Sequence, residues 1–249
     1  MTVIETLLAD LPVGCRVIYV YVGANWILSL VSDSDNMQLA GVASTPRQIA
    51  AESRFQIGHY TLDEAAQTTA NLLLSDDPTT AAVGLATVNA LNRLDEAELY
   101  NDDAANWLSA QCVNRNIAMF GRFPFIDGEI RPFARQVWVF EQEPQGDELY
   151  ISEIAPVLPE ADIVAITGST VINHTIDAIL PHVNPDSLVV VLGPSTPLSP
   201  KLFNCGVDAL FGVRVVDVQR VVESVLAGDG FQKMQGLQRV ALFKPRTIT

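Results

Sequence analysis

Two short turns of small and hydroxyl-bearing residues are the segments of this sequence best suited to chemistry. Thr167-Gly168-Ser169-Thr170 and Gly193-Pro194-Ser195-Thr196 each follow a short apolar run. Small residues leave backbone N–H groups open to a ligand, and hydroxyl groups can both donate and accept hydrogen bonds. Taken singly, each turn has a simpler explanation, as a helix cap or as a proline-stiffened loop. They indicate a binding site only if the fold brings them together.

Four further polar side chains could contribute to such a site. Arg122, within Gly121-Arg122-Phe123-Pro124-Phe125, could hold a carboxylate or a phosphate. Glu141 lies 20 residues after Gly121, the spacing at which dinucleotide-binding folds place a ribose-binding acid, although the GxGxxG turn is absent. Asn173 follows the first hydroxyl turn. Asn89 shares a predicted helix with Gly84, a glycine that indicates either close helix packing or the approach of a ligand.

The second half of the chain must position most of these residues. From residue 116 onward, short apolar runs alternate with turns and helical segments, which is typical of a doubly wound, mostly parallel sheet. Ligands of such sheets bind beyond the carboxyl ends of the strands, where both hydroxyl turns and Arg122 would fall. The predicted strands are 117–120, 136–140, 162–166, 188–192, 209–213 and 239–243, and the predicted helices are 151–158, 171–180, 200–204 and 218–226.

The first half has a different order, a helix, then antiparallel strands, then several helices, which is typical of an α+β domain. Thr45-Pro46 has the pattern of a helix start, and Thr61 and Glu64 have the spacing of a capping box. We therefore expect a smaller α+β domain over residues 1–112 and a Rossmann-like α/β domain over residues 113–249. The predicted elements are helices 2–11, 61–74, 77–94 and 102–112, a helix opening at 45–46, and strands 16–22, 26–31 and 36–43.

Composition excludes several classes of partner. The 249 residues include 29 acidic and 15 basic residues, a net charge of −14, so the chain repels nucleic acids and anionic membrane surfaces. No window of about 18 apolar residues and no signal-peptide pattern are present, which indicates a cytoplasmic protein. The three cysteines, which form no CxxC pair, fit a reducing compartment. They are Cys15, Cys112 and Cys205.

Metal-binding and catalytic patterns are incomplete. His174 and Asp177 share one predicted helix face, but no second pair accompanies them. Ser169 lacks the GxSxG elbow of a hydrolase nucleophile. Catalytic residues, and whether the protein is an enzyme at all, therefore stay unassigned. The cofactor is unknown, with a divalent metal as one candidate.

Several of these segments together resemble a bacterial and archaeal family described as putative heavy-metal chelation. The resemblance rests on residues 121–125 (GRFPF), 161–177 (ADIVAITGSTVINHTID), 189–217 (VVVLGPSTPLSPKLFNCGVDALFGVRVVD) and 84–92 (GLATVNALN). It implies an enolase-N-terminal-like domain followed by a Rossmann-like domain, a site in the cleft between them and a role in heavy-metal binding. Arg122 stands where the family pattern has histidine, which removes an imidazole ligand.

The leading hypothesis is a protein that binds a small anionic or metal-chelating ligand in the interdomain cleft. The alternative is a nucleotide- or S-adenosyl-dependent enzyme, and a third reading is direct metal sequestration. A small molecule or metal is the expected partner, and the oligomeric state stays open, a homo-oligomer included. The expected ligand-binding residues are Gly121, Arg122, Phe123, Pro124, Glu141, Gly168, Ser169, Thr170, Asn173, Gly193, Pro194, Ser195, Thr196 and Asn89.

Overall fold

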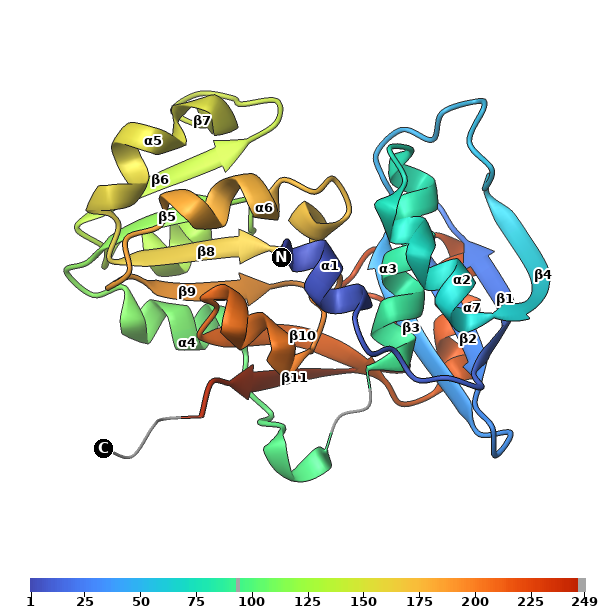
Figure 1. Cartoon of the computed structure of the whole chain (residues 1–249). Helices are drawn as coiled ribbons and strands as arrows, with labels where there is room; N and C mark the ends of the chain where they lie inside the picture. Colours follow the sequence, from blue (N-terminus) through green and yellow to red (C-terminus); the bar gives the residue numbers. More distant parts are fainter. Residues whose placement is uncertain (93–94, 246–249) are drawn as a thin grey trace.

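Two β-sheets of different construction organise the chain (Figure 1). The computed structural model describes residues 1–92 and 95–245. The smaller sheet is antiparallel, and the larger is parallel except for its last strand, as predicted for the fold class. The smaller sheet has the order β3 (Gln38–Ser44), β2 (Trp26–Ser32), β1 (Arg16–Val22), β4 (Gly58–Ala65). The larger has the order β11 (Leu237–Phe243), β10 (Ala209–Val215), β9 (Leu188–Leu192), β8 (Ile163–Thr167), β5 (Asn116–Phe120), β6 (Gln136–Glu141), β7 (Leu149–Tyr150).

The small sheet is covered on both faces, because side chains alternate along its strands. In β2, Ile27 belongs to the core beneath the helix α3 (Pro78–Leu91). Trp26 and Leu28 point the other way, against the helix α7 (Val218–Ala227), which comes from the second half of the chain. All but the last residue of β2 are buried. Short helices extend the α3 layer: α2 (Ala66–Ala70) and the 3₁₀ turn η1 (Asn71–Leu74).

Gly84 explains how α3 can lie so close to its neighbours. A Cβ added at Gly84 would come within 2.1 Å of the Leu73 backbone nitrogen. A Cβ added at Gly41 of β3 would likewise come within 2.2 Å of the Ala90 backbone nitrogen. The glycine in this helix therefore serves close packing between backbones, one of the two explanations that the sequence left open.

The large sheet reverses its direction of winding between β5 and β8. From β5 the chain proceeds outward to β6 and β7, and then returns to build β8, β9 and β10 on the other side. This is the strand order of doubly wound α/β folds, in which the reversal opens a crevice at the carboxyl ends of the strands. The remaining elements are η2 (Glu96–Glu98), α4 (Ala104–Gln111), the π-helical turn η3 (Ile126–Ile130), η4 (Ile151–Glu153), α5 (Ile154–Val157), η5 (Leu158–Glu160), η6 (Gly168–Val171), α6 (Ile176–Ile179), η7 (Leu180–His182) and η8 (Pro200–Cys205).

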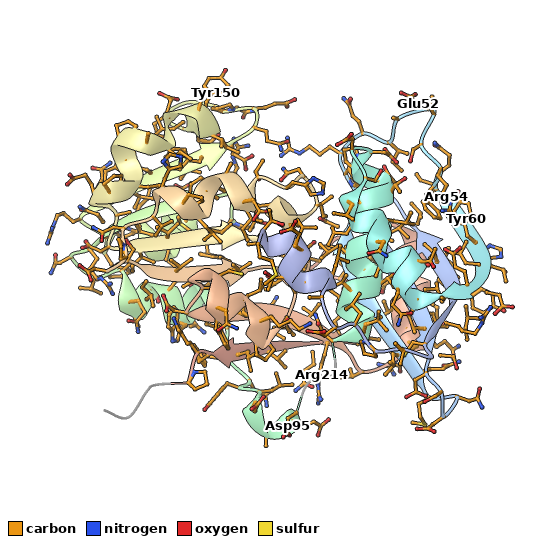
Figure 2. The ribbon with its side chains drawn as sticks, in the orientation of Figure 1. Glu52, Arg54, Tyr60, Asp95, Tyr150 and Arg214 are labelled. Atoms are coloured by element: carbon orange, nitrogen blue, oxygen red, sulfur yellow. The ribbon has the colours of Figure 1, made fainter. Side chains whose placement is uncertain are left out.

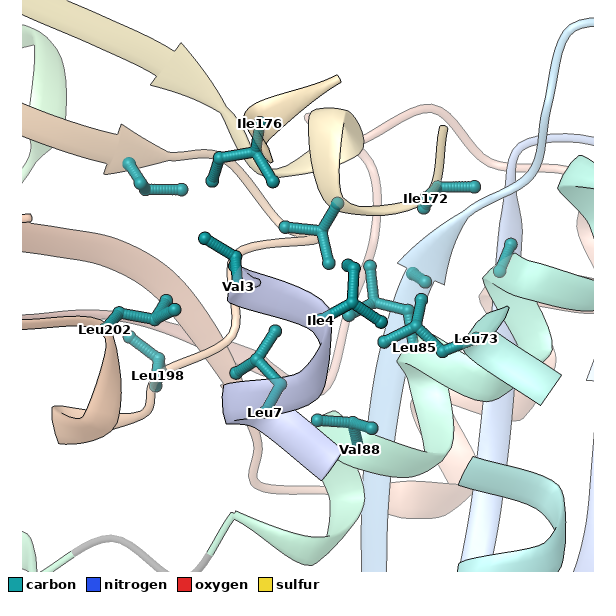
Figure 3. Close-up of a cluster of buried hydrophobic side chains, with 14 of the residues drawn as sticks. Val3, Ile4, Leu7, Leu73, Leu85, Val88, Ile172, Ile176, Leu198 and Leu202 are labelled. Atoms are coloured by element: carbon teal, nitrogen blue, oxygen red, sulfur yellow. The ribbon is translucent and has the colours of Figure 1, made fainter. Parts of the chain in front are cut away.

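The N-terminal helix α1 (Val3–Leu8) joins the two halves (Figure 3). Thr2 and Glu5 form a capping box that starts this short helix. Its buried side chains lie between two groups, one from the second half of the chain and one from the α3 layer, so a single hydrophobic core runs through both halves. On α1 the labelled side chains are Val3, Ile4 and Leu7; on the second half Leu198, Leu202 and Ile176; on the α3 layer Leu73, Leu85 and Val88.

The helix α4 lies on the large sheet, although the sequence assigned it to the first domain. Leu108 is buried in the core beneath that sheet. The centroid of the Trp107 ring lies 5.2 Å from that of Phe211 and 5.6 Å from that of Phe243. We therefore propose that the boundary between the two parts precedes α4 and does not fall near residue 112.

Two predicted helix starts in the first half of the chain fail. No helix begins at Thr45-Pro46, since residues 45–57 form bends and turns. The capping-box spacing of Thr61 and Glu64 occurs inside β4, an edge strand on which Tyr60 marks the outer margin of the sheet (Figure 2). Alternating burial along β4 allows it to pair with β1, and this pairing outweighs the local helix signal.

The predicted helix 171–180 is also broken. The 3₁₀ turn η6 is followed by His174 at φ +58° and then by the four-residue α6. The helix predicted to reach Leu94 ends at Leu91, and its last two predicted positions lie outside the described residues. Within residues 1–92 and 95–245, no helix is long and apolar enough to cross a bilayer.

Candidate functional site

Three adjacent strands of the large sheet end at one edge and lead into glycine turns. Gly121 follows β5 and Gly193 follows β9, each at φ +108°, a backbone conformation that favours glycine. Gly168 follows β8, and a Cβ there would lie only 2.4 Å from the Thr196 backbone nitrogen. The two hydroxyl turns that the sequence singled out are therefore in direct backbone contact.

The hydroxyl groups of these turns face the small sheet. The Ser44 backbone N–H, at the end of β3, donates to Ser195 Oγ (2.9 Å). Ser44 Oγ lies 3.1 Å from Ser169 Oγ and accepts from Ser195 Oγ at 3.0 Å. Ser195 and Thr196 are each only 2% exposed. This network joins the two halves of the protein, so these hydroxyls are held in an interface.

Asn89 reaches the same interface from α3. Its Nδ2 donates to the Val42 carbonyl oxygen (2.9 Å) and, at 3.5 Å, to that of Ser195. Its Oδ1 and the Thr196 Oγ1 are buried without a hydrogen-bond partner in the described chain. The Thr170 hydroxyl donates back to the Thr167 carbonyl oxygen (2.7 Å), which stabilises the turn itself.

The charged residues predicted for the site are bound to each other. The Arg122 guanidinium group donates to both carboxylate oxygens of Glu148, Nε to Oε1 at 2.7 Å and Nη2 to Oε2 at 2.5 Å. This hydrogen bonding lowers the pKa of Glu148 and raises that of Arg122. Glu141 Oε1 accepts the Arg122 backbone N–H at 2.6 Å. The Arg122 guanidinium group is therefore already paired, and one oxygen of the Glu141 carboxylate is occupied by a backbone N–H.

Asn173 lies apart from the other predicted residues. It is exposed, and its Oδ1 accepts from the hydroxyl (2.7 Å) and the backbone N–H (3.2 Å) of Thr175. The side chain thus shapes the turn before α6.

A pocket of about 980 Å³ lies beside the hydroxyl network, at the carboxyl ends of β8 and β9. It extends over β10, to the start of α4 and to the segment 227–233 that follows α7. Phe123, Pro124, Gly193 and Pro194 are the predicted site residues that line it. Its other lining residues include four aromatic, four acidic and two basic side chains: Trp26, Phe125, Phe211 and Phe231; Asp102, Asp103, Glu129 and Asp229; Lys233 and Arg239.

The β1–β2 turn of the small sheet completes the pocket. Trp26 Nε1 donates to the Asp229 carbonyl oxygen (2.9 Å), and Asn25 Nδ2 donates to that of Gly228 (2.8 Å). A Cβ at Gly23 would lie 2.2 Å from the Val225 carbonyl oxygen, so the turn rests directly on the end of α7. The Trp26 and Phe231 rings pack with centroids 5.9 Å apart. Both halves of the chain thus build the pocket wall.

Sequence reasoning missed most of the pocket lining. Trp26 and Asp229 are far apart in the sequence, and no local pattern relates them. One usable signal was the Gly228-Asp229-Gly230-Phe231 segment, in which glycines flank an aromatic residue after a helix. For metals, the described residues contain no group of three or more His, Cys, Asp or Glu side chains placed to hold an ion.

The fold and the pocket define a two-sheet α/β protein with a small-molecule-sized cavity at the carboxyl edge of a doubly wound sheet. The chain belongs to the DUF364 family, described as "Putative heavy-metal chelation", whose profile matches residues 103–244. A second profile with the same description, DUF4213, matches residues 4–92. The family resemblance seen in the sequence is thus confirmed.

Known relatives share the fold over nearly the whole chain. A DUF364 protein of unknown function from Desulfitobacterium hafniense superposes with a TM-score of 0.79 at 20% identity, covering 97% of each chain. A DUF364 protein of unknown function from Pyrococcus horikoshii gives 0.79 and 20%, covering 96% of each. An uncharacterized protein from Methanocaldococcus jannaschii is 26% identical over 158 residues, and the matched region spans 61% of the length of each protein.

Proposed function

We propose that the pocket binds a small, flat organic ligand that can itself hold a metal ion. The observation that carries the proposal is the aromatic lining drawn from both halves of the chain, which contains two packed ring pairs, Trp26 with Phe231 and Phe123 with Phe125. Aromatic side chains bury the apolar faces of flat ligands well. The family description supports a metal as part of the cargo.

In this proposal the protein holds the organic part, and the ligand's own donor atoms hold the metal. The hydroxyl network around Ser44 holds the two halves together, and therefore holds Trp26 of the first half against the aromatic residues of the second. Its buried hydroxyls act on the shape of the pocket and do not bind the ligand themselves.

The alternative of a nucleotide- or S-adenosyl-dependent enzyme has less support. Dinucleotide folds hold a pyrophosphate at the N-terminus of the helix that follows the first strand. Here β5 leads into the π-helical turn η3, and Glu141 takes the Arg122 backbone N–H that follows the strand. A carboxylate at that position disfavours a phosphate.

The proposal is tested with 1,10-phenanthroline, a flat aromatic chelator, by isothermal titration calorimetry. Phenanthroline should bind, and Phe231→Leu should weaken binding about tenfold because an aromatic contact is lost. Tyr150→Leu, at an exposed position on the edge strand β7 of the large sheet (Figure 2), is the matched control and should leave binding unchanged.

Two results would overturn the proposal. The first is no binding of phenanthroline, or equal weakening by both variants. The second is tight binding of zinc chloride alone that Phe231→Leu does not alter, since this would indicate direct sequestration of the metal elsewhere on the chain.

A further inference from the structure

The pocket contains more negative than positive charge. Four carboxylates line it, those of Asp102, Asp103, Glu129 and Asp229, against two basic groups. Arg239 forms an ion pair with Asp103, in which Nη1 donates to Oδ2 at 2.8 Å. Among the residues that the structure describes, Asp102, Glu129 and Asp229 form no ion pair, and Lys233 is the one basic group of the lining left to offset them.

The aromatic side chains of the lining also favour a positively charged ligand. The face of an aromatic ring carries partial negative charge and attracts cations, most strongly where water is excluded. The pocket already shows this interaction, because the Arg239 guanidinium carbon lies 5.0 Å from the centroid of the Phe231 ring. Phe123 and Phe125 form a second, stacked pair with centroids 5.4 Å apart.

We propose that the ligand of this pocket is flat and carries net positive charge, either on a ring nitrogen or on the metal that it chelates. Its plane would lie against the aromatic side chains, and the unpaired carboxylates of Asp102 and Asp229 would complement its charge. An anionic ligand would be repelled by these carboxylates, which form no ion pair among the described residues. The inference rests on the proposed function of the same pocket and adds the sign of the ligand's charge.

Three probes of similar shape test the sign: N-methylquinolinium, neutral quinoline and anionic 1-naphthoate, each titrated calorimetrically near neutral pH and low salt. The cation should bind about tenfold more tightly than quinoline, and naphthoate no more tightly than quinoline. The double variant Asp102→Asn with Asp229→Asn should lower the affinity for the cation more than that for quinoline, so that the preference for the cation disappears.

The control variant removes two carboxylates that lie outside the pocket lining, Asp186→Asn with Glu52→Gln; Glu52 lies at the outer end of the small-sheet half (Figure 2). It changes the net charge of the protein by the same amount and should keep the preference. A parallel titration compares phenanthroline with its zinc complex. Tighter binding of the complex, lost in the pocket variant, supports the inference and assigns the charge to the metal.

The outcomes separate the two proposals. Equal affinity for all three flat probes, a preference for naphthoate, or a cation preference that both double variants lower equally would overturn the inference about charge and leave the pocket's function standing. Absence of binding for every probe would overturn the proposed function itself.

Discussion

The positions of the turns that contain Gly168 and Ser195 could be predicted from the sequence, but the hydrogen-bond partners of their side chains could not. The Gly-Ser-Thr and Gly-Pro-Ser-Thr turns pointed to one sheet edge, and the structure brings them together there. Ser44, whose hydroxyl lies within hydrogen-bond distance of the Ser169 hydroxyl, is 125 residues earlier in the sequence, and no local pattern predicts this contact. The sequence likewise indicated Arg122 as a ligand-binding cation, because its ion pair with Glu148 is visible only in the structure.

The contact at Gly168 leads to a prediction about stability. Gly168→Ala would press a methyl group against the backbone of Ser195 and Thr196, and backbone has little freedom to move aside. We expect the free energy of unfolding to fall by roughly 2–3 kcal/mol, measured by urea denaturation. Gly128→Ala, where a Cβ meets nothing within 4 Å, is the control and should change it by less than about 0.5 kcal/mol. A similar small effect at both glycines would contradict the tight contact.

Helices and strands with continuous apolar runs were predicted well. Elements whose conformation depends on pairing with a distant strand were not. The strands β5, β8 and β9 follow from their short, buried apolar runs, which in β8 and β9 are rich in β-branched residues. The edge strand β4 was read as a helix start, because its pairing with β1 is not visible locally. The helix α3 was recognised from its cap and its proline, Asp77 and Pro78, and both occupy the expected positions.

The cap of α3 gives a prediction about pH. Burial alone would raise the pKa of Asp77, but hydrogen bonds from Ser53 and Thr80 outweigh it, so the pKa lies below its ordinary value. A lowered folded-state pKa stabilises the protein above the unfolded-state value of about 3.9, and this contribution is lost as the pH falls through the folded-state pKa.

Asp77→Asn keeps a capping oxygen but loses the charge that strengthens the hydrogen bonds from Ser53 and Thr80, so it should lower the free energy of unfolding by about 0.5–1 kcal/mol near neutral pH. The deficit relative to the unaltered protein should shrink as the pH falls below about 4. Urea midpoints across this pH range measure it, with Asp76→Asn, at an exposed neighbour, as the control. A deficit that stays constant down to acid pH would count against the role of the charge.

At the scale of the whole molecule, the two halves are joined by shared hydrophobic clusters as well as by the connecting chain. The helix α1 fills the space between them, α7 of the second half covers the small sheet, and one hydrophobic cluster continues through both (Figure 3). The sequence indicated two domains by their different element order. It could not indicate how they dock, because the docking surfaces are apolar faces that look like any other part of a core.

We expect the protein to unfold in one cooperative transition, in which tryptophan fluorescence and circular dichroism coincide. Leu7→Ala, which removes a buried side chain from α1, should shift that single transition and lower stability by about 2–5 kcal/mol. Val13→Ala, at an 84% exposed position, should shift it very little. Two separate transitions, with Leu7→Ala affecting one of them, would show that the halves are independent.

The turn between β1 and β2 has a consequence for how this chain can change over evolution. Its backbone rests against α7 at Gly23, and Asn25 and Trp26 are bonded to the carbonyl groups that follow that helix. An inserted or deleted residue in the turn would displace the indole from the pocket and lift the small sheet from α7 at once. Length variation among related sequences should therefore avoid the turn and accumulate in segments such as residues 47–52, where the chain follows no regular structure and most residues are exposed.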